Sequence, residues 1–215
     1  MEENITKAKN LIDKATEVVV VPLPQRDAFL AALALAGWLH EKGKSVRVVA
    51  STLPIGFEAP AYGELVTNSF GPRHLLVSFD YSKAQIEKVD YRVENGIFNL
   101  TLGPVGSALQ LSEVAVNFDR SPLDLLVTVG LADWSDLPEG LSAELSSLAL
   151  TSHLALGIFT TSFGNGTLSV VDLEASSLGG LVFRLLSQLS EVPSEKVARI
   201  LLAGLSETRP LQDQP

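Results

Sequence analysis

Residues 17–50, EVVVVPLPQRDAFLAALALAGWLHEKGKSVRVVA, constrain the fold more than any other part of the sequence. The run of four valines is typical of a strand that is buried on both faces, and a Pro-containing loop follows it. The segment DAFLAALALAGWLHEKG then predicts a helix that ends near Gly43, and SVRVVA predicts a second strand. A strand, a helix and a strand within about 35 residues form a βαβ unit, which implies a parallel sheet with a right-handed crossover.

Similar patterns continue along the chain. Buried strands with a loop after them are predicted at 123–133 and 153–166, and a short strand at 168–172. Further helices are predicted at 4–16, 176–191 and 193–208, with Ser176 or Ser177 as the N-cap of the second. The middle of the chain contains short β segments and the hairpin turn signal ENG at 94–96.

These patterns predict an α/β fold. We expect a mostly parallel sheet flanked by helices on both faces, with an antiparallel section inserted around 74–118. The chain has 215 residues, of which 46% are hydrophobic and 19% charged, so it can bury a substantial core. No repeat or obvious linker divides it, and a single domain over residues 1–215 is predicted.

Composition excludes several kinds of chemistry. The sequence has no cysteine, which removes disulfides, thiolate nucleophiles and cysteine-based metal sites. A net charge of −9 without a basic cluster argues against a long nucleic-acid track, although a local patch can still hold a small nucleotide. The amphipathic N-terminus is not a signal peptide, and the apolar run at 29–39 is too short to span a bilayer. No membrane association and a cytoplasmic location are expected.

The usual motifs of catalysis are missing. No GxGxxG follows a strand, and neither a P-loop nor a GxSxG elbow occurs. The sequence SSLGG at 176–180 either presents free amides to an anion or serves close helix packing. The histidines lack a second ligand at metal-binding spacing, and we interpret them as structural.

Acids at predicted strand ends are the remaining candidates. Asp27, Asp80, Asp133 and Asp136 lie where an open parallel sheet places its ligands. Each is also an ordinary turn or cap residue, and Asp27 equally suits a cap for the helix that follows it.

The order of the segments resembles the N-terminal domain of the DHH phosphoesterase superfamily over about residues 5–212. The opening VVVVPLPQRDAFLAALALAGWL resembles the first motif, in which a strand leads to two acids two residues apart and then a helix. LDLLVTVGLAD resembles the second motif, and HLALGIFTTSFGN resembles the strand and loop of the Asp-His-His motif. VVDLEASSLGGLVFRLLSQL and VARILLAGLSETRPLQ resemble the two segments that close that domain.

The resemblance implies two divalent cations, usually manganese, held by the acids and histidines of these motifs for the hydrolysis of phosphoesters. This sequence departs from the pattern at almost every ligand. Asp27 keeps the place of the second acid, and Glu207 corresponds to the last one. The other ligand positions are changed: Gln25 stands in place of the first acid, Gly130 in place of the second-motif Asp, and Phe159, Thr160 and Thr161 in place of Asp-His-His. Two cations with so few anionic ligands would leave uncompensated charge, so no bound metal is expected.

Three functions remain open. The first is a catalytically inactive domain of this kind that binds a protein or a small nucleotide, as a homodimer or as a heterodimer with an active homologue. The second is an active manganese-dependent phosphoesterase acting on short oligonucleotides or nucleotides, with a site rearranged around Asp27, Asp80, Asp133, His153 or Glu207. The third is a shared architecture with an unrelated function. The second, substrate-binding domain of the superfamily is absent from these 215 residues.

Overall fold

The predicted βαβ unit is present in the computed structural model, which describes residues 2–54, 61–70, 73–83, 85–104, 110–120, 123–137, 141, 151–189 and 192–205. Strand β1 (Glu17–Pro22) leads to helix α2 (Arg26–Glu41), and strand β2 (Ser45–Val49) returns parallel to β1. Val18 of β1 pairs with Val46 of β2. The chain divides into two compact units, residues 71–121 and the remainder.

Six parallel strands form the sheet of the larger unit, in the order β10-β9-β8-β1-β2-β3. The four further strands are β3 (Val66–Thr67), β8 (Leu125–Val129), β9 (Ser152–Gly157) and β10 (Thr167–Val171). The chain builds the sheet outward from β1 to β3, and then restarts at β8 on the other side of β1. The strand order therefore reverses between β1 and β8, the position at which open α/β sheets bind ligands.

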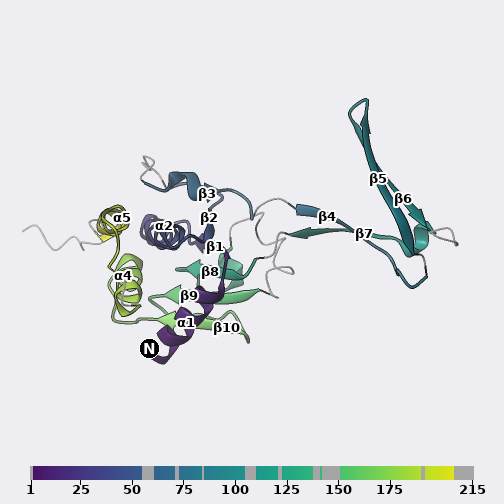
Figure 1. Ribbon diagram of the computed structural model, residues 1–215. Helices are drawn as coiled ribbons and strands as arrows, with labels where there is room; N and C mark the ends of the chain where they lie inside the picture. The colour runs from purple at the N-terminus through teal and green to yellow at the C-terminus, as the bar shows by residue number, and fades with distance from the viewer. Residues whose placement is uncertain are drawn as a thin grey trace, which may run out of the picture. The chain divides into compact units, whose positions relative to one another are not determined.

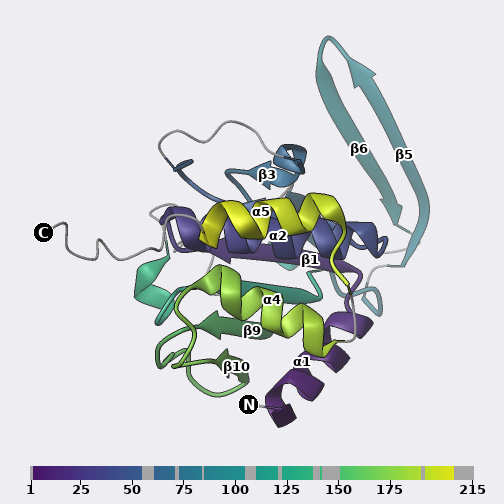
Figure 2. The ribbon, with the colours of Figure 1, turned by 90° about the vertical axis from the view of Figure 1, so that its left-hand side faces the viewer.

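Helices cover one face of this sheet. Helix α1 (Glu2–Lys14), α2, α4 (Leu178–Gln188) and α5 (Glu195–Leu205) pack in one apolar cluster with Val18 and Val20 of β1. Figure 2 views this helical layer, with α4 and α5 in front of the strands. Within the described ranges, no helix is long and apolar enough to cross a bilayer.

The opposite face carries the alternate side chains. Val19 and Val21 of β1 pack there in a second cluster with Leu131, Leu137 and Phe163. The 3₁₀ helix η3 (Trp134–Asp136) contributes Trp134 to this cluster. Helical segments thus flank the sheet on both sides, and the predicted α/β fold class is confirmed.

The unit of residues 71–121 is antiparallel, as predicted for the section around 74–118. Strand β4 (Arg73–Ser78) pairs with β7 (Ala115–Arg120), and β5 (Ile86–Glu94) pairs with β6 (Ile97–Pro104). Asn95 and Gly96, with φ of 52° and 77°, form the hairpin turn that ENG predicts. Figure 1 shows the long β5–β6 hairpin.

The described part of the chain also contains two short 3₁₀ segments, η1 (Gly63–Leu65) and η2 (Leu111–Glu113). A single domain over residues 1–215 stays a prediction. The division into two compact units does not show whether either unit folds without the other.

Gly37 of α2 allows the ring of Tyr62, the residue before η1, to pack closely against the helix. Tyr62 is 7% exposed, and its hydroxyl donates a hydrogen bond to the Glu41 carboxylate. A Cβ added to Gly37 would lie 2.5 Å from the Tyr62 ring. Glycine in the middle of a helix is otherwise unfavourable, so this one is explained by the ring that it admits.

We predict that Gly37→Ala lowers the free energy of unfolding by about 1–3 kcal/mol, because the new methyl group forces the buried ring to move. In a Tyr62→Ala background, the same change should instead be neutral or stabilising, since helix propensity then acts alone. Urea unfolding of the four variants measures both effects. A Gly37→Ala protein more stable than the parent would contradict the packing argument.

Candidate functional site

The loops after β1 and β8 lie next to each other at the point where the strand order reverses. The amide of Leu23 donates a hydrogen bond to the Val129 carbonyl over 2.9 Å, and the amide of Gly130 donates to the Leu156 carbonyl over 2.8 Å. The segments 23–27 and 130–133, which follow β1 and β8, are therefore brought together.

Asp27 lies in the first turn of α2, but its carboxylate binds a different helix. Its Oδ2 accepts a hydrogen bond from the Leu178 amide over 2.8 Å, and its Oδ1 accepts one from the Gly179 amide over 3.2 Å. The residue at the N-cap of α2 is Gln25, whose side chain makes no capping hydrogen bond. The prediction that Asp27 caps α2 was wrong: Asp27 is already inside that helix, and it caps α4.

Ser177 completes the start of α4. It is fully buried at the N-cap, and its Oγ accepts a hydrogen bond from the Gly180 amide over 3.0 Å. The amides of the first three residues of α4 thus all have acceptors inside the protein. The sequence SSLGG was expected either to present free amides to an anion or to serve close helix packing. The amides do bind an anion, and that anion is the Asp27 carboxylate of the same chain.

Two glycines lie beside this carboxylate, at positions where an added Cβ would make only an ordinary van der Waals contact with it. A Cβ on Gly179 of α4 would lie 3.5 Å from Asp27 Oδ1, and a Cβ on Gly204 of α5 would lie 3.6 Å from the same oxygen. Three helices therefore approach one another around Asp27. The carboxylate is part of their packing.

At Gly130, the position of the second-motif acid in the resemblance, a side chain would strain the backbone and displace Leu178. Its φ is +80°, and a Cβ there would lie 2.7 Å from Leu178 Cδ1 and 3.4 Å from Ala28 Cβ. Leu178 is only 4% exposed. An apolar side chain therefore fills the place beside Gly130, where a carboxylate would have to enter.

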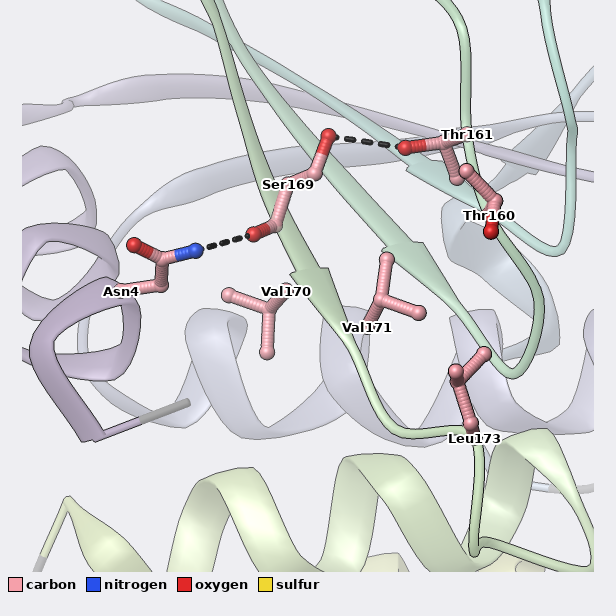
Figure 3. Close-up of a pocket in the computed structure, with 7 residues that line it drawn as sticks. All are labelled: Asn4, Thr160, Thr161, Ser169, Val170, Val171 and Leu173. Atoms are coloured by element: carbon pink, nitrogen blue, oxygen red, sulfur yellow. Dashed lines mark hydrogen bonds between the residues drawn. The ribbon is translucent and has the colours of Figure 1, made fainter.

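Residues 159–161, at the Asp-His-His positions, lie near the edge strand β10. Thr160 and Thr161 line a pocket of about 290 Å³ with Ser169 and four other uncharged residues: Asn4, Val170, Val171 and Leu173. Figure 3 shows the hydroxyls of Thr161 and Ser169 joined over 2.8 Å, and Asn4 Nδ2 donating to the Ser169 carbonyl. Phe159 is 38% exposed. This lining offers hydroxyl groups and no anionic metal ligand.

Asp133 and Asp136 are used in a turn after β8. Asp133 Oδ1 accepts a hydrogen bond from the Ser135 amide over 2.7 Å, and Asp136 Oδ2 accepts one from the Ala132 amide over 2.6 Å. The Ser135 hydroxyl and amide hold the pKa of Asp133 below its usual value. Together the two acids form the capping box of η3.

Asp80 belongs to the other unit, residues 71–121. It accepts hydrogen bonds from the hydroxyl and amide of Ser82, which lower its pKa, and it pairs with Lys83 at 3.7 Å. This is a local turn on an exposed segment. Glu207 lies outside the described residues.

His153 is a core residue on the second face of the sheet. It is 3% exposed, and its Nε2 and Nδ1 each lie 3.0 Å from a threonine hydroxyl, of Thr128 and Thr167 respectively. Trp134 stacks on the ring at 4.7 Å, and Phe163 meets it edge to face at 4.7 Å. Burial lowers the pKa of His153 to about 4, so the ring is neutral at pH 7. Both ring nitrogens are occupied by hydroxyl partners.

The candidate residues that the structure describes therefore do not form one metal centre. No group of three or more His, Asp or Glu side chains suited to a metal occurs within the described ranges. Asp27 lies at the switch point with its oxygens bound to amides, and Asp133, after β8, is held in the capping box of η3. The residues present there do not fit a two-cation site, which needs several carboxylates.

Comparison with known proteins agrees on the architecture. No family model matches the sequence, and no curated protein matches it. Among solved structures, the chain is similar to an exopolyphosphatase-related protein from Bacteroides fragilis, with a TM-score of 0.64 and 13% sequence identity. The similarity covers 97% of this chain and 50% of that protein, so the chain spans half of the protein's length. The two proteins share a fold.

We predict that Asp27→Ala lowers the free energy of unfolding by about 1–2 kcal/mol, because the amides of Leu178 and Gly179 lose their acceptor. Asp27→Asn should cost less, since its amide oxygen can still accept one of these hydrogen bonds. Urea unfolding in a chelating buffer measures both changes. No stability loss in either variant would show that the cap contributes nothing.

A second prediction concerns pH. The folded pKa of His153 is about 4 and its unfolded value is near 6.5, so the unfolded state takes up the proton first as the pH falls. The free energy of unfolding should therefore decline between about pH 6.5 and 4, by up to roughly 3 kcal/mol from this group. Urea unfolding across this range measures the slope. His153→Gln should reduce it, whereas the control His40→Gln, at an exposed position on α2, should not. Equal slopes in the two variants would contradict the assignment.

Proposed function

We propose that this chain is a degenerate DHH phosphoesterase-like domain that acts by binding and assembly, and that it does not hydrolyse phosphoesters. The observation that carries the proposal is the commitment of Asp27 to the amides of Leu178 and Gly179. In the resemblance, the same position supplies a metal ligand. Here the positive end of a helix replaces the cation as the partner of the carboxylate.

The surroundings of Asp27 support this interpretation. Gly130 stands at the place of the second-motif acid, with Leu178 packed against it, and threonines replace ligands at 160 and 161. Clustered carboxylates without cations would repel one another, so loss of the acids is consistent with a stable metal-free domain. Loss of a single ligand would be compatible with catalysis, but loss of nearly the whole set together with apolar filling is not.

Binding then falls to surfaces outside the former metal site. Partners of three kinds suit such a domain: a second copy of the chain, an active homologue, and a small nucleotide held without hydrolysis. The similarity to an exopolyphosphatase-related protein supports a phosphoesterase-like fold, and it is compatible with each of these partners.

The competing function is a manganese-dependent phosphoesterase with a rearranged site. It requires further acids to move towards Asp27, whose two oxygens each already accept an amide hydrogen bond. Asp133 and Asp136 would have to abandon the capping box of η3, and His153 would have to give up two hydroxyl partners. Several hydrogen bonds would therefore be broken to assemble the site.

The test is a titration with Mn²⁺ by calorimetry, together with hydrolysis assays on a dinucleotide, a nucleoside bisphosphate and polyphosphate. We predict no heat of stoichiometric Mn²⁺ binding and no metal-dependent turnover. Asp27→Ala and Asp133→Ala serve as matched variants, because each removes one carboxylate that accepts hydrogen bonds at the start of a helix. Turnover in the parent that is abolished by Asp27→Ala and retained in Asp133→Ala would overturn the proposal.

A further inference from the structure

One face of the β5–β6 hairpin is apolar and open to solvent. The register pairs Tyr91 with Leu100 and Val93 with Phe98, so these side chains share a face with Val89. Their exposed fractions are large: Val89 61%, Tyr91 74%, Val93 65%, Phe98 62% and Leu100 47%. Single exposed apolar residues need no explanation, but a contiguous set of five does.

The other face of the same hairpin is mostly charged or polar, with Ile97 opposite Glu94 beside the turn. Lys88 pairs with Asp90 at 2.7 Å, and Arg92 pairs with Glu94 at 3.5 Å, while Asn99 lies opposite Arg92. Charged and apolar residues alternate along β5, which is the pattern of a strand with one covered face and one solvated face. The sequence of the hairpin is therefore that of a sheet whose apolar face is covered.

The stability of the β5–β6 hairpin also requires that its apolar face be covered. A two-stranded hairpin is at best marginally stable in water, and three strands or a second layer are normally needed. The five residues expose on the order of 600 Å² together, which is at the upper end of the largest apolar patch on a typical monomer (~300–600 Å²) and approaches the ~800 Å² that each partner contributes to a standard interface. Tyr91 and Phe98 already stack, with ring centroids 5.9 Å apart, and form a rigid aromatic centre for such an interface.

We propose that this apolar face binds the same face of a second copy of the chain, so that two hairpins form a two-layer β-sandwich. The face carries no charge that would select an acidic or a basic partner. A peptide that added a strand to the hairpin would pair along its edges and leave the face exposed. An identical face is self-complementary about a two-fold axis, and it doubles the buried area.

The geometry follows from the two-fold axis. An axis that crosses the strands near Tyr91 places the tip of each hairpin against the base of the other. Val89 then meets the tip residues of the second copy, and the aromatic centre packs on itself. The inference concerns residues 86–104 alone and does not depend on the loss of hydrolysis.

The first test measures mass in solution by light scattering at about 100 µM chain, well above the dissociation constant expected of a standard interface. We expect twice the mass of one chain for the parent and one chain for Tyr91→Asp and Leu100→Asp. The matched control Asn99→Asp makes the same change on the opposite face of β6 and should keep the dimer. A monomeric parent, or a dimer that survives both face substitutions, would overturn the proposal.

A second test does not disturb the hairpin with a charge. Because the sequence has no cysteine, a single introduced cysteine reports its own neighbourhood. Tyr91→Cys should form a disulfide-linked dimer under mild oxidation, since the two-fold axis brings the two copies of this position together. Arg92→Cys, one residue away on the polar face, should remain unlinked. Equal linking of the two variants would mean random collision and would contradict the proposed face.

Discussion

The bond between the Asp27 carboxylate and the amides of Leu178 and Gly179 is the interaction on which the larger unit depends. It joins the segment after β1 to the segment after β10, two parts of the chain 151 residues apart. Gly179 of α4 and Gly204 of α5 lie beside it. A carboxylate at a helix N-terminus is satisfied by fixed dipoles, so this arrangement needs no cation.

A single contact of this kind changes what the neighbouring positions can hold. Leu178 begins α4 at the place that the carboxylate fixes, and its side chain packs against Gly130. The apolar filling at the switch point and the capping by Asp27 are therefore two parts of one arrangement. On the other face of the sheet, the ring of His153 stacks on Trp134 and is neutral at pH 7.

The sequence determined the fold class and most element positions, because periodicity reports burial directly. The four valines of β1 and the ENG turn are local signals that predicted the structure correctly, and the N-cap of α4 is Ser177, one of the two serines that the sequence allowed. The partner of Asp27 was not predictable in the same way, since a first-turn acid suits its own helix equally well. The one sequence feature that pointed to this partner is SSLGG, because the amides at a helix start with two glycines are accessible to an acid. The environment of His153 depends on three strands and was inaccessible to spacing arguments.

A domain that binds no metal must keep the Asp27 carboxylate on the amides of α4 when metal is supplied. A crystal structure of the chain grown with millimolar Mn²⁺ tests this most directly. We predict that both oxygens of Asp27 stay on the amides of Leu178 and Gly179, with Leu178 still packed against Gly130 and no anomalous peak beside them. A carboxylate turned away from α4 and bound to manganese, with a second acid drawn to the same ion, would contradict the account.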